Sequence, residues 1–457
     1  MGYLTNIKHF APLVLYLAGL LFFLFGIFGR GQFALLLVIF LIPLRNIVEK
    51  VQEFPLGNQM IDILIAGAVF GWLGSSISKK KQIFAPSTLN MTIVILVFYM
   101  FLSLLLGNNY LNGSFFVNLP EVRLQNWKNF CLMPLLFFIC LNYFKEKIWI
   151  YRALAVMGLA MILMEYYTVT QISWYSALIS REKIHGTFEF LGPNEVAAFF
   201  NEYTVILMGI FSFIKEKRIK WLLLIMICAN IYCILFLYSR GAYMGLMAGM
   251  ALIFLFKNRK LLIPLVFVAL FWQAILPAQV IERIKQTTGE YGQLDESSQR
   301  RISIWEYSLE LFQKNPLVGI GLDVFPFLGL DLGDTHNIYV KYLVEQGLVG
   351  IAIFLTVIFC FLRMGYVLYK KGEDDLSKGM GLGLMACIVT LIVNNCFGNR
   401  WTYLEISAYL WIFAGLVGRF IVMAKNPEPS AEAQQSAKTT PAATEEKYKK
   451  KLRYYDI

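Results

Sequence analysis

Residues 334–350, DTHNIYVKYLVEQGLVG, place ionisable side chains at the start of a hydrophobic segment. The stretch contains His336, one of three histidines in 457 residues, together with Asn337 and Glu345. Because imidazole titrates near neutral pH, His336 is a candidate general base that takes a proton from an attacking hydroxyl. Asn337 and Glu345 are candidate supporting residues, with Glu345 either holding the segment in place or tuning the histidine. A lone histidine at a helix start is, however, more often a structural hydrogen bonder.

Basic side chains that suit an anion occur at other boundaries between hydrophobic segments. Arg240 separates two apolar stretches in YSRGAY, and an arginine at that depth is usually neutralised by a partner. Arg181 and Lys183 precede Asn194, a candidate helix cap, and a helix N-terminus beside cations is a typical anion site. Arg301 stands at the start of an amphipathic segment. Taken singly, each has a plainer explanation: a snorkelling arginine, a capped span or a solvated helix face.

A general base that faces several cations at a lipid boundary suits a lipid-linked diphosphate. Arginines stabilise the negative charge that develops on the leaving group, while His336 accepts the proton of a sugar hydroxyl. The polar stretches on this side contain neither a DxD motif nor a pair of His or Cys ligands. We therefore expect no obligatory metal ion and no cofactor.

The composition predicts a membrane protein with an all-α polytopic fold. The chain is 58% hydrophobic with a mean hydropathy of +0.59, compared with about 45–50% in ordinary soluble domains. Runs of about 20 apolar residues are long enough to cross a bilayer. They predict 12 or 13 transmembrane helices, near 10–28, 31–48, 60–77, 88–107, 128–144, 148–171, 195–214, 219–238, 241–256, 261–278, 347–369, 380–397 and 401–424.

The basic residues indicate the orientation. They gather in the turns at 79–81, 145–147, 215–220, 257–260 and 370–371, which fall on one side if the spans alternate. Positive turns mark the cytoplasmic side, so the net charge of +11 indicates contact with membrane lipid and gives no reason to expect a nucleic-acid partner. The candidate residues then lie on the outer face. The sequence does not determine on which side of the membrane the N-terminus lies.

We expect one transmembrane domain over 1–424 and a disordered cytoplasmic tail over 425–457. An outer-face helical segment covers 279–346. The seven cysteines lack CxxC spacing and fit small core residues.

The outer segment carries several local signals. Asn315-Pro316 ends its amphipathic helix, and Gly319 and Gly321 permit a tight turn after it. Asp334 or Thr335 can cap the next helix, which places His336 in its first turn, and Gly347 opens the following span. The apolar face of the amphipathic helix is predicted to consist of Ile302, Trp305, Leu309 and Phe312.

Four stretches together resemble the bacterial O-antigen ligase and O-antigen polymerase family. They are YSRGA, GTFEFLGPNEVAAF, RISIWEYSLELFQKNPLVGIGLDVF and THNIYVKYLVEQGLVG, all within 180–350. The resemblance implies a glycosyltransferase of the GT-C type in the bacterial cytoplasmic (inner) membrane. Its donor would be an undecaprenyl-diphosphate-linked glycan, and its active site would face the periplasm or the cell exterior.

The resemblance also implies residue roles. His336 corresponds to the base, Arg240 to a residue that holds the diphosphate, and Arg301 to the outer helix that closes the site. The family usually has a basic residue shortly before Gly-Thr-Phe; Lys183 is nearest and Arg181 lies two positions further back, so both stay candidates. The acceptor is lipid A-core in a ligase and a growing lipid-linked polysaccharide in a polymerase. A flippase and a chain-length regulator are partners implied only by the resemblance.

Two other classes of function remain open. A transporter or flippase of lipid-linked oligosaccharides should have charged residues near the bilayer midplane and an internal repeat. Glu202 lies within a predicted span, Glu165 and Glu405 lie toward outer ends, and no repeat is visible. A non-catalytic scaffold of a polysaccharide assembly complex leaves the histidine and arginine set unexplained, and it predicts that His336→Ala preserves glycan output.

Overall fold

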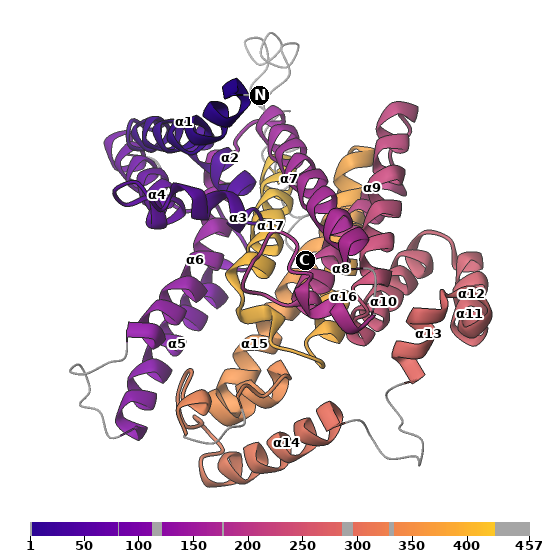
Figure 1. Cartoon of the computed structure of the whole chain (residues 1–457). Helices are drawn as coiled ribbons and strands as arrows, with labels where there is room; N and C mark the ends of the chain where they lie inside the picture. The colour runs from indigo at the N-terminus through magenta and orange to yellow at the C-terminus, as the bar shows by residue number, and fades with distance from the viewer. Residues whose placement is uncertain are drawn as a thin grey trace, which may run out of the picture.

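The computed structural model describes residues 2–80, 82–111, 121–175, 178–285, 296–328 and 333–425 (Figure 1). These residues form helices and connecting turns without a β-strand, which confirms the all-α prediction. The tail predicted over 425–457 lies outside the described residues, apart from Lys425.

The α-helices are α1 (Gly2–Ile27), α2 (Gly31–Leu41), α3 (Arg45–Val48), α4 (Met60–Ser78), α5 (Asn90–Tyr110), α6 (Glu121–Tyr143), α7 (Lys147–Trp174), α8 (Pro193–Phe211), α9 (Lys217–Phe236), α10 (Arg240–Lys257), α11 (Leu262–Leu270), α12 (Trp272–Ile275), α13 (Ala278–Lys285), α14 (Glu296–Lys314), α15 (Ile338–Lys371), α16 (Asp375–Asn394) and α17 (Leu404–Lys425). Short 3-10 helices are η1 (Glu49–Val51), η2 (Gly57–Gln59), η3 (Leu178–Lys183), η4 (Arg259–Leu261), η5 (Phe325–Phe327) and η6 (Arg400–Thr402).

The described residues contain fewer candidate spans than the 12 or 13 predicted. Within the described ranges, ten helices are long and apolar enough to cross a membrane, and the pair α2 and α3–η1, bent by 109°, would be an eleventh. The predicted span 261–278 is divided into α11 and α12, both much shorter than the roughly 20 residues that a bilayer requires. The predicted span 195–214 is the single helix α8, which contains Asn201 and Glu202 and is not among these ten. The chain is an integral membrane protein.

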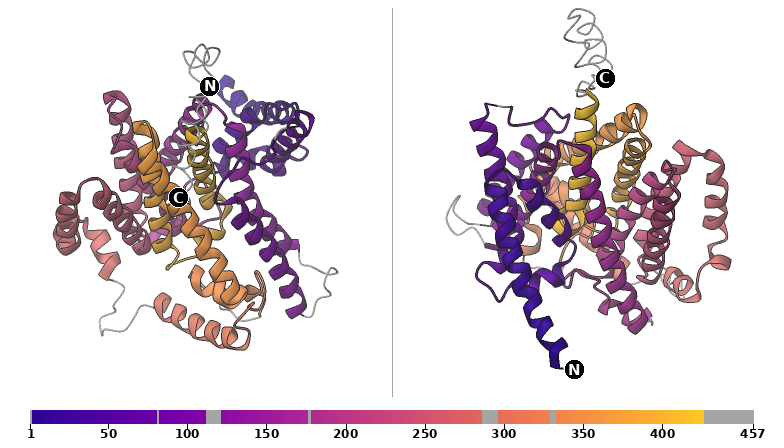
Figure 2. Two further views of the ribbon diagram at one scale, coloured as in Figure 1. Left: turned by 180° about the vertical axis from the view of Figure 1, so that it is seen from behind. Right: turned by 90° about the horizontal axis from the view of Figure 1, so that it is seen from above.

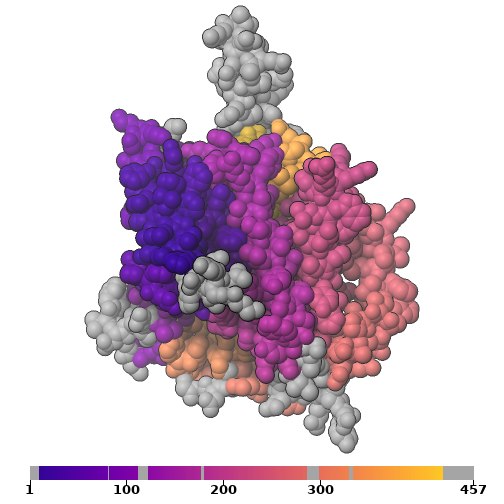
Figure 3. Space-filling view, turned by 45° about the horizontal axis from the view of Figure 1, so that its top comes forward, coloured from indigo at the N-terminus to yellow at the C-terminus, as the bar shows by residue number. Residues whose placement is uncertain are grey.

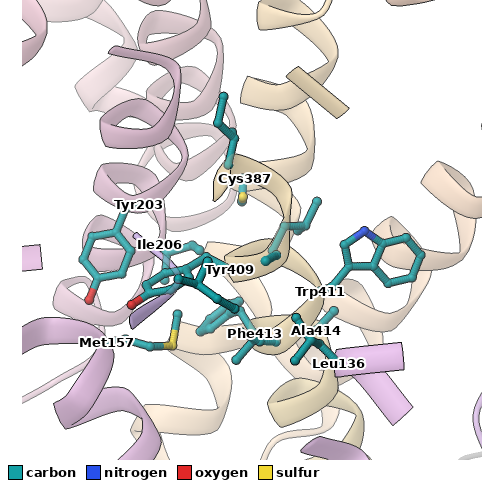
Figure 4. Packing of buried hydrophobic residues seen from close by; sticks show 14 of the residues in the cluster. Leu136, Met157, Tyr203, Ile206, Cys387, Tyr409, Trp411, Phe413 and Ala414 are labelled. Atoms are coloured by element: carbon teal, nitrogen blue, oxygen red, sulfur yellow. The ribbon is translucent and has the colours of Figure 1, made fainter. Parts of the chain in front are cut away.

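The central helices α8, α16 and α17 are mostly buried by the rest of the bundle. Figure 4 shows Tyr203 of α8 beside Tyr409 of α17, with ring centroids 6.2 Å apart. Helices α8 and α16 pack backbone against backbone, since a Cβ on Gly209 would lie 2.5 Å from the Gly383 Cα. Small residues permit this close approach in membrane bundles. The N-terminal helices lie on one side of this core and α11–α13 on the other (Figures 2 and 3).

The two ends of α16 distinguish the two ends of the bundle. Lys147 and Lys215, from two basic turns, form ion pairs with the acidic residues at the start of α16, at 2.9 and 3.1 Å. At its other end, the Asn395 carbonyl accepts a hydrogen bond from the Ile338 amide at 3.0 Å. The 20 residues of α16 separate these ends by about 30 Å. We call the end with Asn395 and Ile338 the site end.

Helix α14 lies across the site end, below the start of α15 in Figure 1. Its bounds agree with the predicted amphipathic helix, which stops just before Asn315-Pro316. The predicted apolar face is wrong at Ile302 and Leu309, which are 39% and 48% exposed, because Ile304, Ser308 and Leu311 face the protein instead. Ser308 is tolerated there because its hydroxyl donates to the Ile304 carbonyl at 2.7 Å.

Helix α15 is broken at Gly347, which has φ 63° and opens the long span as predicted. The segment 316–321 runs beside the break, and it forms hydrogen bonds with the backbone groups that the break leaves without helical partners. The Gly321 amide donates to the Glu345 carbonyl at 2.8 Å, and the Leu348 amide donates to the Pro316 carbonyl at 2.9 Å. A broken helix is stable in a membrane protein when other parts of the chain satisfy its backbone in this way.

We expect Gly321→Ala to lower the melting temperature of the detergent-solubilised protein by several degrees. Gly321 has φ 108°, and a Cβ would lie 2.1 Å from the Gly107 Cα. The backbone must therefore move, which typically costs about 1–3 kcal/mol. The matched control is Gly74→Ala, where a Cβ meets nothing within 4 Å. Equal melting temperatures for the two variants would contradict this account of the 316–321 turn.

Candidate functional site

His336 lies at the site end immediately before α15, with φ 51° and an exposed side chain. The helix is capped by Asn337, whose Oδ1 accepts hydrogen bonds from the amides of Tyr339 at 3.0 Å and Val340 at 3.3 Å. The predicted caps, Asp334 and Thr335, are therefore wrong, and His336 precedes the helix instead of lying in its first turn. Histidine is among the residues that tolerate this left-handed conformation best.

The residues around His336 determine its protonation. Desolvation by protein atoms, followed by the charge of Arg301, lowers the pKa of His336 below its usual value; Asp334 opposes this effect. Arg400 lowers the pKa further and Glu195 raises it. The net lowering leaves the imidazole neutral at neutral pH, which is the form that accepts a proton.

Arg301 reaches this site because α14 is attached to the loop before α15. Trp305, one turn after Arg301, donates from Nε1 to the Thr335 carbonyl at 2.9 Å. The Asp334 carboxylate accepts from the Thr335 amide at 2.8 Å and so holds the same loop. The structure thus brings Arg301 and His336 together, although 35 positions separate them in the sequence.

The guanidinium of Arg181 is buried and hydrogen-bonded to other groups of the protein. Arg181 is 4% exposed, and its guanidinium donates to the Tyr238 carbonyl at 3.0 Å and to the Asn194 Oδ1 at 3.1 Å. Asn194 is the second residue of α8, after the N-cap Gly192 and Pro193, so the prediction that it caps the helix is wrong. Its side chain instead fixes Arg181 against the start of α8.

The other two predicted cations flank Arg181. Arg240 is the first residue of α10, and its charge acts on Arg181. Lys183 is exposed, with its ammonium 5.6 Å from the centre of the Tyr175 ring. Of the two basic residues before Gly-Thr-Phe, Lys183 is therefore the more accessible.

Glu345 holds the turn beside α15. It is fully buried, and its carboxylate accepts from the amides of Asp323 at 3.0 Å and Phe325 at 3.3 Å. Of the two roles considered for Glu345, the contacts support holding the segment.

A buried ionic cluster that was not predicted from the sequence lies beneath this turn. The Lys341 ammonium lies 3.4 Å from Asp334, 3.7 Å from Asp323 and 3.9 Å from Glu345. Burial raises the pKa of Asp334, but the charge of Lys341 and hydrogen bonds from Asn399 and Thr335 together leave it below the usual value. Arg123 adds a second buried cation and donates to the Leu322 carbonyl at 2.6 Å. The spacing of four residues between Lys341 and Glu345 was the one visible signal.

The pair of Arg400 and Glu195 was also missed. Arg400 in η6 forms an ion pair with Glu195 in the first turn of α8, and both act on His336. Its signal was a basic residue in the short turn 398–400, on the side where positive-inside statistics disfavour one. Across the described chain, no group of three or more His, Cys, Asp or Glu is arranged to hold a metal ion.

Residues 221–355 match the family model described as O-Antigen ligase. This part of the chain is similar to the O-antigen ligase family. The match runs from α9 into α15 and includes Arg240, Arg301, His336 and Glu345. It confirms the resemblance drawn from the sequence, and it supports an O-antigen-ligase-like function in a membrane. A search of curated proteins found no match.

Proposed function

We propose that this protein transfers a glycan from an undecaprenyl-diphosphate-linked donor to a sugar hydroxyl, without a metal ion. The observation that carries the proposal is the exposed His336, whose pKa is lowered, set among the cations Arg301 and Arg400. This arrangement pairs a proton acceptor with groups that stabilise a phosphate leaving group.

The proposed reaction is a single displacement at the anomeric carbon. The acceptor oxygen forms a bond to this carbon while His336 takes the hydroxyl proton. The bond from the anomeric carbon to the diphosphate oxygen breaks, and that oxygen keeps the electron pair. Arg240, Arg301 and Lys183 stabilise the charge on the departing undecaprenyl diphosphate. His336 then releases its proton to water, which restores the base.

We place the site on the periplasmic or outer face of the bacterial inner membrane. The support is that Lys147 and Lys215, from two of the basic turns, meet at the end of α16 away from His336. Basic turns are typical of the cytoplasmic side. The orientation can be checked by labelling a cysteine introduced at Lys183 with a membrane-impermeant maleimide in intact cells, using a cysteine at Lys215 as the control.

The acceptor can be identified by glycan profiling of a deletion strain complemented with the wild type, His336→Ala or Arg240→Ala. A ligase predicts full-length glycan accumulating on undecaprenyl diphosphate, because only the transfer to lipid A-core is lost. A polymerase predicts accumulation of single repeat units. Normal glycan in cells that carry a membrane-inserted His336→Ala variant would reject the enzyme proposal and favour the scaffold.

One observation favours the alternative function, a transporter of lipid-linked oligosaccharides. Glu165 and Glu202 lie inside the bundle, 7% and 4% exposed, and each has a buried carboxylate oxygen with no hydrogen-bond partner among the described residues. Buried carboxyl groups in membrane spans often belong to transport pathways. Movement of a fluorescent lipid-linked glycan across reconstituted vesicles, without formation of a glycosyl product, would support transport.

Arg301→Gln is expected to move the acidic limb of the pH–rate profile to higher pH. The charge of Arg301 lowers the pKa of His336, so removing it raises that pKa. Because His336 acts as a base, transfer then stops at a higher pH than in the wild type. The measurement is kcat/KM against pH, with Arg300→Gln as the neighbouring control. An acidic limb that stays in place, or moves to lower pH, would argue against His336 as the titrating group.

A further inference from the structure

A carboxylate occupies the position at the start of α8 where an anion would be most stable. Glu195 lies in the first turn of this 19-residue helix, whose dipole favours negative charge there. Its Oε1 pairs with Arg400, and its Oε2 would lie 3.2 Å from a Cβ on Gly192, so the side chain folds back over the helix end. The Glu195 side chain is only 17% exposed, which makes this pair unlike a solvated surface ion pair.

Arg400 is held rigidly beside this carboxylate. It is 6% exposed, and the Ser407 hydroxyl donates to its carbonyl at 3.0 Å. The next residue, Trp401, is fully buried, and its amide donates to the Asn395 side chain at 3.1 Å. The guanidinium is therefore presented by a fixed backbone, a geometry that suits bidentate binding of phosphate oxygens.

Further cations surround Glu195. The Arg181 guanidinium is bound to Asn194, the residue before Glu195, and the charges of both Arg240 and Glu195 act on it. His336 is also within the electrostatic reach of Glu195 and Arg400. One carboxylate, already paired with Arg400, thus lies close to the cations that the proposed function assigns to the diphosphate.

We propose that Glu195 is a resident anion that the diphosphate of the donor displaces from Arg400, so that Arg400 is a further leaving-group-binding residue. This inference rests on the proposed function. A diphosphate carries more negative charge and more acceptor oxygens than a carboxylate, so it competes successfully for the guanidinium. In the empty enzyme, Glu195 keeps the buried cation neutralised, which avoids the high cost of an unpaired buried charge.

The test is binding of inorganic pyrophosphate and of geranyl diphosphate to the purified full-length protein in detergent, followed by calorimetry. Glu195→Gln should bind diphosphate about tenfold more tightly than the wild type, because Arg400 no longer needs to leave a partner. Arg400→Gln should bind about tenfold more weakly, and Arg400→Lys should fall between them. Preference for geranyl diphosphate would identify a lipid-borne ligand, and equal binding a site for the phosphate groups alone.

Glu182→Gln is the matched control. Glu182 also pairs with an arginine, Arg181, at 3.2 Å, but its side chain is 74% exposed. Its removal should change diphosphate affinity less than twofold if the position of Glu195, and not net charge, is responsible. Equal tightening in Glu182→Gln and Glu195→Gln would overturn the inference.

Further results of the binding experiment would also test the inference about Glu195 and Arg400. Unchanged or weaker binding in Glu195→Gln, or wild-type affinity in Arg400→Gln, would overturn it, as would a wild type that binds neither probe. If Arg400→Gln does not fold, Glu195→Gln and Arg400→Lys still determine the order of affinities. Because binding is measured without turnover, an inactive enzyme with the expected order of affinities would refute the proposed function and leave the displacement of Glu195 supported.

Discussion

Replacing His336 with alanine is expected to reduce glycan transfer by about 10²–10⁴-fold, which is the typical contribution of a general base. The side chain is exposed, and it has no hydrogen-bond partner among the described residues, so its removal should not prevent folding. His336→Asn is a useful second variant, because asparagine tolerates the left-handed backbone at φ 51° but cannot act as the base. Transfer can be measured in membrane vesicles supplied with donor and acceptor, after normalisation to the amount of inserted protein.

The matched control is His185→Ala. His185 lies in the loop before α8, where its Nδ1 is 3.1 Å from the Leu191 carbonyl. We expect transfer to fall no more than a few-fold in this variant, since it loses one local hydrogen bond. Comparable activity in the wild type and the inserted His336→Ala variant would remove His336 from the mechanism.

Lys341→Met is expected to have the largest effect on stability. The Lys341 ammonium lies within 4 Å of the carboxylates of Asp323, Asp334 and Glu345. Removing one partner of a buried ionic cluster typically costs about 3–5 kcal/mol, because the remaining charges are uncompensated. The measurement is the melting temperature in detergent, with Lys183→Met as the control, since Lys183 is exposed.

The same variant should show an altered pH dependence. Lys341 makes the largest of the contributions that lower the pKa of Asp334 against the effect of burial. Without Lys341, burial is opposed only by the smaller contributions of Asn399, Thr335 and His336, so the pKa of Asp334 rises relative to the wild type and the folded state loses stability when this carboxyl ionises. The stability deficit of Lys341→Met should therefore be greatest at high pH and should shrink as the pH falls. A deficit that does not depend on pH would show that lost packing, and not charge, causes the instability.

Local signals in the sequence were sufficient for the elements that carry the site. Helix α14 ends where Asn315-Pro316 predicts, and the long span begins at Gly347. These features depend on backbone preferences within a few residues, which the sequence contains directly. The buried face of α14 could not be predicted in this way. Ile302 and Leu309 are exposed, because the face that a helix buries depends on the neighbouring elements that it contacts.

The predictions that were wrong or missing concern features that depend on tertiary contacts, or on a choice between neighbouring residues of similar propensity. Asn337 caps α15 although Asp334 and Thr335 are also favourable caps by residue type. Arg400 and Glu195 are 205 positions apart, so no local pattern predicts their ion pair. Hydropathy averages over a window, and it therefore combined α11 and α12 into one span despite the break at Phe271.

The most direct test of the account is transfer by the purified protein reconstituted in liposomes with an undecaprenyl-diphosphate-linked donor and an acceptor glycan. We predict one undecaprenyl diphosphate released for each glycan transferred, activity that persists after treatment with a metal chelator, and loss of both products in His336→Asn. Release of the carrier at the wild-type rate in His336→Asn, or transfer that stops on chelation and returns with a divalent cation, would contradict the proposed metal-independent mechanism with His336 as its base.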